Sequence, residues 1–152
     1  MQIDDAATIL AGADFFDICS EEERRLLAFA SERKRYPAGA VIFSRGEVPA
    51  GAQVLVSGTV SIANGEDGKG RPRLVSQPGT IMATMALVVA RPREVTVTAE
   101  GLVETLLVPR HAFMKLANQS PEFARRAAER IRQDLVGFVS AVTPVKDKFG
   151  KE

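Results

Sequence analysis

Cysteine and histidine are almost absent from this sequence, which has one of each, Cys19 and His111, and no tryptophan. A single cysteine excludes an internal disulfide and a zinc site built on cysteines, and a single histidine excludes a metal centre built on several imidazoles. The two residues fall in different predicted helical segments, so they do not suggest a nucleophile with its base. We interpret Cys19 as a half-buried structural thiol and His111 as a surface residue. The sequence therefore indicates a protein that is not an enzyme and binds no metal or cofactor.

An excess of charge of one sign is also missing, because 20 Lys and Arg residues stand against 19 Asp and Glu residues and leave a net charge of +1. This balance gives no reason to expect binding to nucleic acid or to a membrane surface. No apolar run approaches the ~18 residues of a spanning helix. The acidic start, with Asp4 and Asp5, does not resemble a signal peptide. At 152 residues, we expect one cytoplasmic domain with a core of its own.

Glycine and proline are concentrated between Pro37 and Gly101, which divides the chain into helical flanks and a middle of strands and turns. Before this region, helical periodicity predicts a lead-in over residues 9–33. Ser20, followed three residues later by Glu23, predicts a capping box at the start of a helix there. In the middle region, short β-prone runs separated by turn residues predict a β-roll over residues 34–108.

The last part of the domain, which is predicted to span residues 9–142, reads as helical over residues 110–142. Ser120 before a proline predicts an N-cap within this part, and residues 143–152 are expected to form a flexible tail. The predicted fold class is therefore α+β and mainly β. It is an antiparallel eight-stranded β-roll, jelly-roll-like, flanked by N-terminal and C-terminal helices.

The helix predicted over residues 121–142 carries an apolar stripe with alternating spacings of four and three residues. Its members are Ala124, Ala128, Ile131, Leu135, Phe138 and Val142. This is a heptad pattern, and it has two interpretations. The helix packs on its own sheet, or it forms a seam with the same helix of a second copy. A dimer seam or a lid would use Ala128, Ile131, Leu135 and Phe138.

The most informative segment is 77–97, where a glycine is followed by a short helical stretch and a Pro-Arg pair that leads into the next strand. In this arrangement, backbone amides at a helix start and the side chain of Arg93 can be directed at one anion. The segment therefore predicts a binding site for an anionic group.

Four segments, in this order, resemble the cyclic nucleotide-binding domain family, which includes the sensor domain of the catabolite activator protein. Phe15-Phe16 with the Ser20 cap resembles the entry helix of the family. Residues 36–47 resemble its first strands and their turn, and residues 54–60, with Ser57-Gly58-Thr59, resemble the strand-glycine-strand motif that follows. The resemblance covers residues 9–142 and places segment 79–97 on the phosphate-binding cassette.

In that family, a glycine and the neighbouring amides of the cassette hold the cyclic phosphate, a glutamate binds the ribose hydroxyl and an arginine pairs with the phosphate. The resemblance assigns the glycine position to Ala83, the glutamate position to Thr84 and the arginine to Arg93. Glu94 replaces a small hydroxyl residue and Val95 replaces an alanine. The candidate ligand-binding residues are Ala83, Thr84, Met85, Ala86, Arg93, Glu94, Val95 and Thr96.

These departures leave two functional hypotheses open. In the first, a stand-alone regulatory domain binds a cyclic nucleotide, cyclic AMP or cyclic GMP, or a similar anionic small molecule, in the β-roll pocket. In the second, Glu94 pairs with Arg93 or Arg91 and fills the anion site, and the domain is a degenerate member used for dimerisation or protein contacts. The sequence ends at Glu152, soon after the long helix, so we expect its output to pass through a homodimer or a partner protein.

Overall fold

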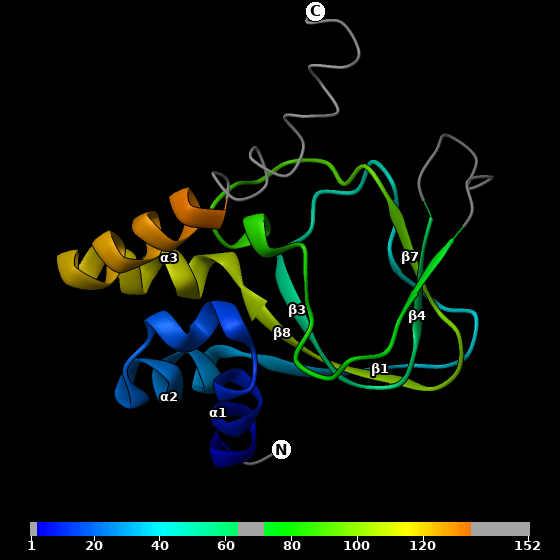
Figure 1. Ribbon diagram of the computed structural model, residues 1–152, viewed down its shortest axis with the longest axis horizontal. Coiled ribbons are helices and arrows are strands. Elements are labelled where there is room, and N and C mark those ends of the chain that lie inside the picture. Colours follow the sequence, from blue (N-terminus) through cyan, green and yellow to red (C-terminus); the bar gives the residue numbers. More distant parts are fainter. Residues whose placement is uncertain (1–2, 64–71, 135–152) are drawn as a thin grey trace, which may run out of the picture.

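The middle of the chain forms eight strands in the computed structural model, which describes residues 3–63 and 72–134 (Figure 1). They are β1 (Glu32–Tyr36), β2 (Val41–Phe43), β3 (Gly51–Ser57), β4 (Val60–Ala63), β5 (Arg73–Val75), β6 (Ile81–Met82), β7 (Thr96–Ala99) and β8 (Val103–Pro109). They make two four-stranded sheets with the orders β1-β8-β3-β6 and β2-β7-β4-β5. Every pairing is antiparallel, and the predicted fold class is confirmed.

The helices lie together on one side of the roll (Figure 1). They are α1 (Ile3–Ala11), the 3-10 helix η1 (Asp14–Ile18), α2 (Glu21–Ala30), the 3-10 helix η2 (Thr84–Leu87) next to the roll, and α3 (Arg110–Gln119); residues 121–134 are also helical. The helical part therefore starts earlier than the lead-in predicted from residue 9.

The strand β1 begins inside the segment that was predicted to be helical, and its sequence, Glu-Arg-Lys-Arg-Tyr, has little β-propensity of its own. It pairs along its whole length with β8. On that neighbour, the Glu104 carboxylate accepts from Arg33 at 2.9 Å and from Arg35 at 3.0 Å. Tertiary pairing, rather than local preference, therefore sets the start of the roll.

Both predicted helix caps are present. The Ser20 hydroxyl accepts from the Glu23 amide at 3.1 Å, and the Glu23 carboxylate accepts from the Ser20 amide at 2.8 Å, which completes the capping box of α2. The Ser120 hydroxyl accepts from the Phe123 amide at 3.2 Å. These side chains satisfy amides that have no partner within the helix.

Two apolar cores hold the fold together, and β3 contributes to both. Ala52 and Val54 face the helices, whereas Leu55 lies inside the roll, as the alternation of side chains along a strand requires. The core beneath the helices is built around four aromatic rings that contact one another in a row, in the order Phe16, Phe15, Phe113 and Phe123.

The helical segment 121–134 packs on the N-terminal helices through Phe123 and Ala127, which are both buried. Of the predicted stripe, Ala128 is exposed, and Ile131 is partly buried against the core beneath the helices. The face that packs within the monomer is therefore rotated away from Ala128. Leu135 and Phe138 lie outside the described residues, and the dimer seam stays a prediction.

Candidate functional site

The cassette turn begins at Ala83, which has φ 65° and ψ 49° and is the only non-glycine residue with positive φ in the described part of the chain. The left-handed region costs an L-residue about 1–2 kcal/mol. Ala83, for which the sequence analysis expected a family glycine, therefore holds a strained conformation in this turn. The 3-10 helix η2 follows at once, and its first amides, on Thr84 and Met85, have no partner within the helix.

The backbone of Arg93 is fastened to the turn that follows β2. Its amide donates to the Glu47 carbonyl at 2.7 Å, and its carbonyl accepts from the Gly46 amide at 2.8 Å. Its guanidinium lies over the Phe43 ring, 5.2 Å from the ring centroid. These contacts fix the position of the guanidinium without using its hydrogen-bond donors.

The Arg93 Nε is the one buried side-chain nitrogen or oxygen without a hydrogen-bond partner in the part of the chain that the structure describes. Burial lowers the pKa of this guanidinium, and the charges of Glu47 and Glu94 partly oppose that shift. An unpaired buried donor is costly, typically by about 1–3 kcal/mol. The arrangement is therefore typical of a donor that awaits an acceptor from outside the chain.

Glu94 does not fill the anion site in the way that the second sequence hypothesis requires. Its side chain is exposed, and among the described residues it forms no ion pair with Arg93 or Arg91. It acts on Arg93 only through its charge. The guanidinium therefore keeps its unpaired donor.

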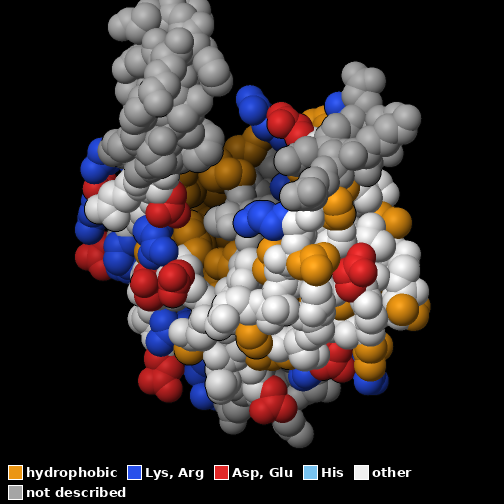
Figure 2. Space-filling view, turned by 45° about the vertical axis from the view of Figure 1, so that its right-hand side comes forward, with side chains coloured by type: hydrophobic (Ala, Val, Ile, Leu, Met, Phe, Trp, Pro, Cys, Tyr) orange, Lys and Arg blue, Asp and Glu red, His pale blue; other side chains and the backbone are white. Residues whose placement is uncertain are grey.

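A pocket of about 830 Å³ lies beside η2, and this is within the range of small-molecule sites. Its walls hold most of the predicted site residues, namely Ala83, Thr84, Met85, Ala86, Arg93, Glu94 and Val95. Thr96 is not among them; its hydroxyl accepts from the Arg45 amide at 3.2 Å and so joins β7 to the turn after β2. Figure 2 shows a hollow with hydrophobic side chains along its wall and basic side chains beside it.

The sequence analysis missed two residues that support this pocket. Phe43 gave no signal beyond its place in a β-prone run. Arg110, at the start of α3, donates through one nitrogen to the carbonyls of Pro49 at 3.0 Å, Ala86 at 3.0 Å and Val89 at 3.5 Å. A cation in the first turn of a helix is electrostatically unfavourable, and this could have marked Arg110 as a residue with a special role.

The two residues considered for chemistry lie away from this pocket. Cys19 is buried, and burial, followed by the charge of Glu23, raises its pKa to about 12. His111 is exposed. Across residues 3–63 and 72–134, no group of three or more His, Cys, Asp or Glu residues is placed to hold a metal ion. Among the same residues, no helix has the length and apolar character needed to cross a membrane.

Comparison with known proteins identifies relatives. The family model described as the cyclic nucleotide-binding domain matches residues 33–120. A cyclic nucleotide-binding-like protein from Brucella abortus is 30% identical over 75% of this chain and 98% of its own, with a TM-score of 0.65.

Two further solved structures, each below 25% identity, show the fold alone. The N-terminal domain of a transcriptional regulator from Streptomyces coelicolor is 21% identical over 88% of this chain and 93% of its own, with a TM-score of 0.76. The regulatory domain of Toxoplasma gondii PKA, crystallised with cAMP, is 21% identical over 84% of this chain and 50% of its own, with a TM-score of 0.65.

Proposed function

We propose that this chain, which belongs to the cyclic nucleotide-binding domain family, is a regulatory domain that binds a cyclic nucleotide or a similar anionic small molecule in the pocket beside η2. The observation that carries the proposal is the buried, unpartnered Nε of Arg93. An oxygen of a bound phosphate would satisfy this donor, and charge-assisted hydrogen bonds of this kind are among the stronger ones in proteins.

The other residues of the pocket wall support the same ligand class. The amides of Ala83 to Met85 lie at the turn into η2, where amides without a partner in the helix can donate to a bound anion. Thr84 would face the sugar of a cyclic nucleotide, where its hydroxyl can make one hydrogen bond. The pocket volume of about 830 Å³ is large enough for cyclic AMP or cyclic GMP.

Glu94 favours a second candidate function, a degenerate domain that binds no anion and acts as a dimerisation or protein-interaction module. A carboxylate at ~4 Å from a phosphate would cost about 4 kcal/mol at an effective dielectric of 20, which is roughly a thousandfold in affinity. Because Glu94 is exposed, solvent screening reduces this repulsion.

The test is a thermal melt with and without cyclic AMP or cyclic GMP at millimolar concentration. A ligand at a hundred times its dissociation constant adds about 2.7 kcal/mol of stability, which raises the midpoint by about 5–10 °C for a domain of this size. Arg93→Ala should remove the shift, whereas Arg91→Ala, which alters an exposed arginine of the same wall, should keep most of it. No shift in the wild type, with a shift in Glu94→Gln, would establish the degenerate candidate.

Both candidate functions allow a dimer, and substitutions inside and outside the heptad stripe test for it separately. We expect wild-type chains to sediment as dimers, and Leu135→Lys to yield monomers because it places a charge in the seam. Gln133→Lys adds the same charge outside the stripe and should leave the dimer intact. An unchanged mass for Leu135→Lys would refute the seam.

A further inference from the structure

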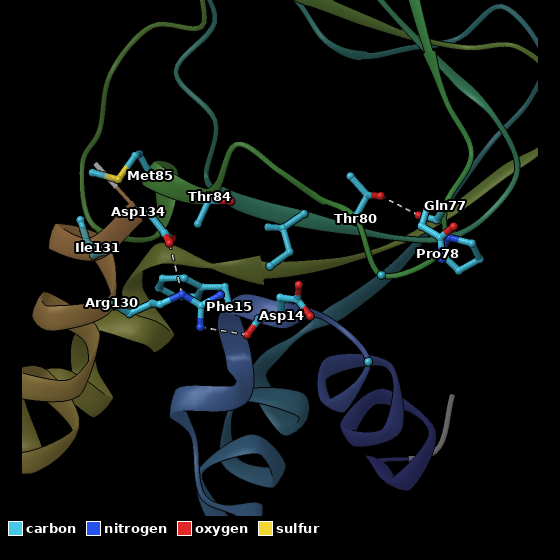
Figure 3. Close-up of a pocket in the computed structure, with 13 residues that line it drawn as sticks. Asp14, Phe15, Gln77, Pro78, Thr80, Thr84, Met85, Arg130, Ile131 and Asp134 are labelled. Atoms are coloured by element: carbon cyan, nitrogen blue, oxygen red, sulfur yellow. Dashed lines mark hydrogen bonds and ion pairs between the residues drawn. The ribbon is translucent and has the colours of Figure 1, made fainter. Parts of the chain in front are cut away.

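A second cavity, of about 590 Å³, lies between the helical side of the molecule and the loop that precedes β6 (Figure 3). Its floor is η1, one wall is residues 77–81, and the other is helical segment 121–134. It borders the pocket beside η2, and Ile81, Thr84 and Met85 line both. Arg93 is not among the residues that line this cavity, so a ligand here would meet a different set of polar groups.

The one cation that lines this cavity, Arg130, is paired with two carboxylates. Its Nη1 donates to an Asp17 carboxylate oxygen at 2.7 Å and to the Asp14 carbonyl at 3.2 Å, and its Nε donates to Asp134 at 3.3 Å. Its guanidinium also lies over the Phe15 ring, 5.8 Å from the centroid. An anion entering here would compete with two carboxylates for the charge of Arg130, so the cavity disfavours phosphate.

A carboxylate without a partner faces the same space. The Asp14 side chain is exposed and, within the described part of the chain, accepts no hydrogen bond and forms no ion pair. Figure 3 shows it directed away from Arg130 and into the cavity. Asp17 and Asp134 pair with Arg130, so these three carboxylates and one guanidinium together carry an excess of negative charge.

The remaining walls are apolar. Phe15 is buried beneath the floor, and the side chains that complete the lining include Pro78, Ile81, Met85 and Ile131. A ligand pocket typically combines such apolar walls with a few polar groups that fix orientation. The combination here suits an apolar body that carries one positive charge.

We propose that this cavity is a second binding site, for a small organic cation whose protonated amine pairs with Asp14 and whose apolar body packs against Ile81, Met85 and Ile131. The charge complementarity is opposite to that of the pocket beside η2, so the two cavities take different classes of ligand. The proposal does not depend on whether the first pocket binds a cyclic nucleotide.

The test compares three probes of the same size and shape, namely benzylammonium, benzyl alcohol and benzoate, by NMR titration of the methyl groups of Ile81, Met85 and Ile131. We expect benzylammonium to bind more tightly than benzyl alcohol, and benzoate to bind least. Equal affinities for the three probes, or no shift of these methyl groups with any of them, would overturn the proposal.

Two matched variants test whether Asp14 is the carboxylate that pairs with the amine of the ligand. Asp14→Asn should weaken benzylammonium by about two- to fivefold, as expected for an exposed charge pair, and should leave benzyl alcohol unchanged. Asp5→Asn makes the same change on the exposed face of α1, outside the cavity, and should have no effect. If both variants weaken the cation equally, Asp14 is not its partner. Arg93→Ala should leave benzylammonium binding intact, which separates failure of this site from failure of the first.

Discussion

Replacing Ala83 by glycine should stabilise the protein, although the same replacement destabilises most positions. Ala83 holds φ 65°, and the left-handed conformation costs an alanine about 1–2 kcal/mol that glycine does not incur. Against this, glycine loses more backbone entropy on folding, by about 0.5–1 kcal/mol. The balance predicts that Ala83→Gly raises the free energy of unfolding by about 0.5–1 kcal/mol.

The assay is urea unfolding of the wild type and of Ala83→Gly. The dependence of the unfolding free energy on urea concentration should be the same for the two proteins, because they expose the same surface on unfolding. In a thermal melt, the midpoint should rise by about 1–4 °C for a chain of this length. The ligand-free protein is used, so that the result reports on the backbone alone.

Ala90→Gly is the matched control. Ala90 is exposed, lies a few residues further along the same segment and has no positive φ. Its replacement should lower the free energy of unfolding by about 0.4–1 kcal/mol. If Ala83→Gly destabilises the protein as much as Ala90→Gly, the strain that we assign to the cassette turn does not exist.

Three further predictions concern groups outside the anion site. Arg110→Met should destabilise the protein by about 2 kcal/mol in urea unfolding, because it leaves carbonyls of η2 and of the loop before β3 without their charged donor; an effect below about 0.5 kcal/mol would contradict the contacts. Cys19, whose pKa burial raises to about 12, should resist iodoacetamide at pH 8 in the native protein and react only on unfolding, as followed by mass spectrometry. At Glu23, burial raises the pKa, but the Ser20 amide and Arg126 outweigh it, so the folded-state pKa is lowered. Wild type should therefore exceed Glu23→Gln in stability at neutral pH, and the difference should shrink as the pH falls below about 4; a difference independent of pH would refute this.

The anion site shows how far reasoning from residue types extends. The order of glycines and the Pro-Arg pair predict the cassette. The caps at Ser20 and Ser120 are confirmed, because a cap depends on residues close together in the chain. The same reasoning predicts that an alanine at position 83 removes backbone freedom from the turn. In the structure, the surrounding fold nevertheless holds Ala83 in the left-handed region.

Contacts between distant segments escape such reasoning. The position of Phe43 under Arg93, the three carbonyls on Arg110 and the start of β1 at Glu32 each join residues far apart in the sequence. No local pattern encodes which partner a long side chain reaches, because that depends on how the elements pack.

The sequence by itself determined the roll, its flanking helices and the family, because hydrophobic periodicity and turn residues act over a few neighbouring positions. Only the tertiary structure decided whether Glu94 pairs with Arg93. Glu94 and Arg93 are adjacent in the chain, yet Glu94 is exposed, while the Arg93 Nε is buried without a partner. Packing decides this difference, because the Phe43 ring lies against the Arg93 guanidinium, and no pattern within the chain encodes that contact.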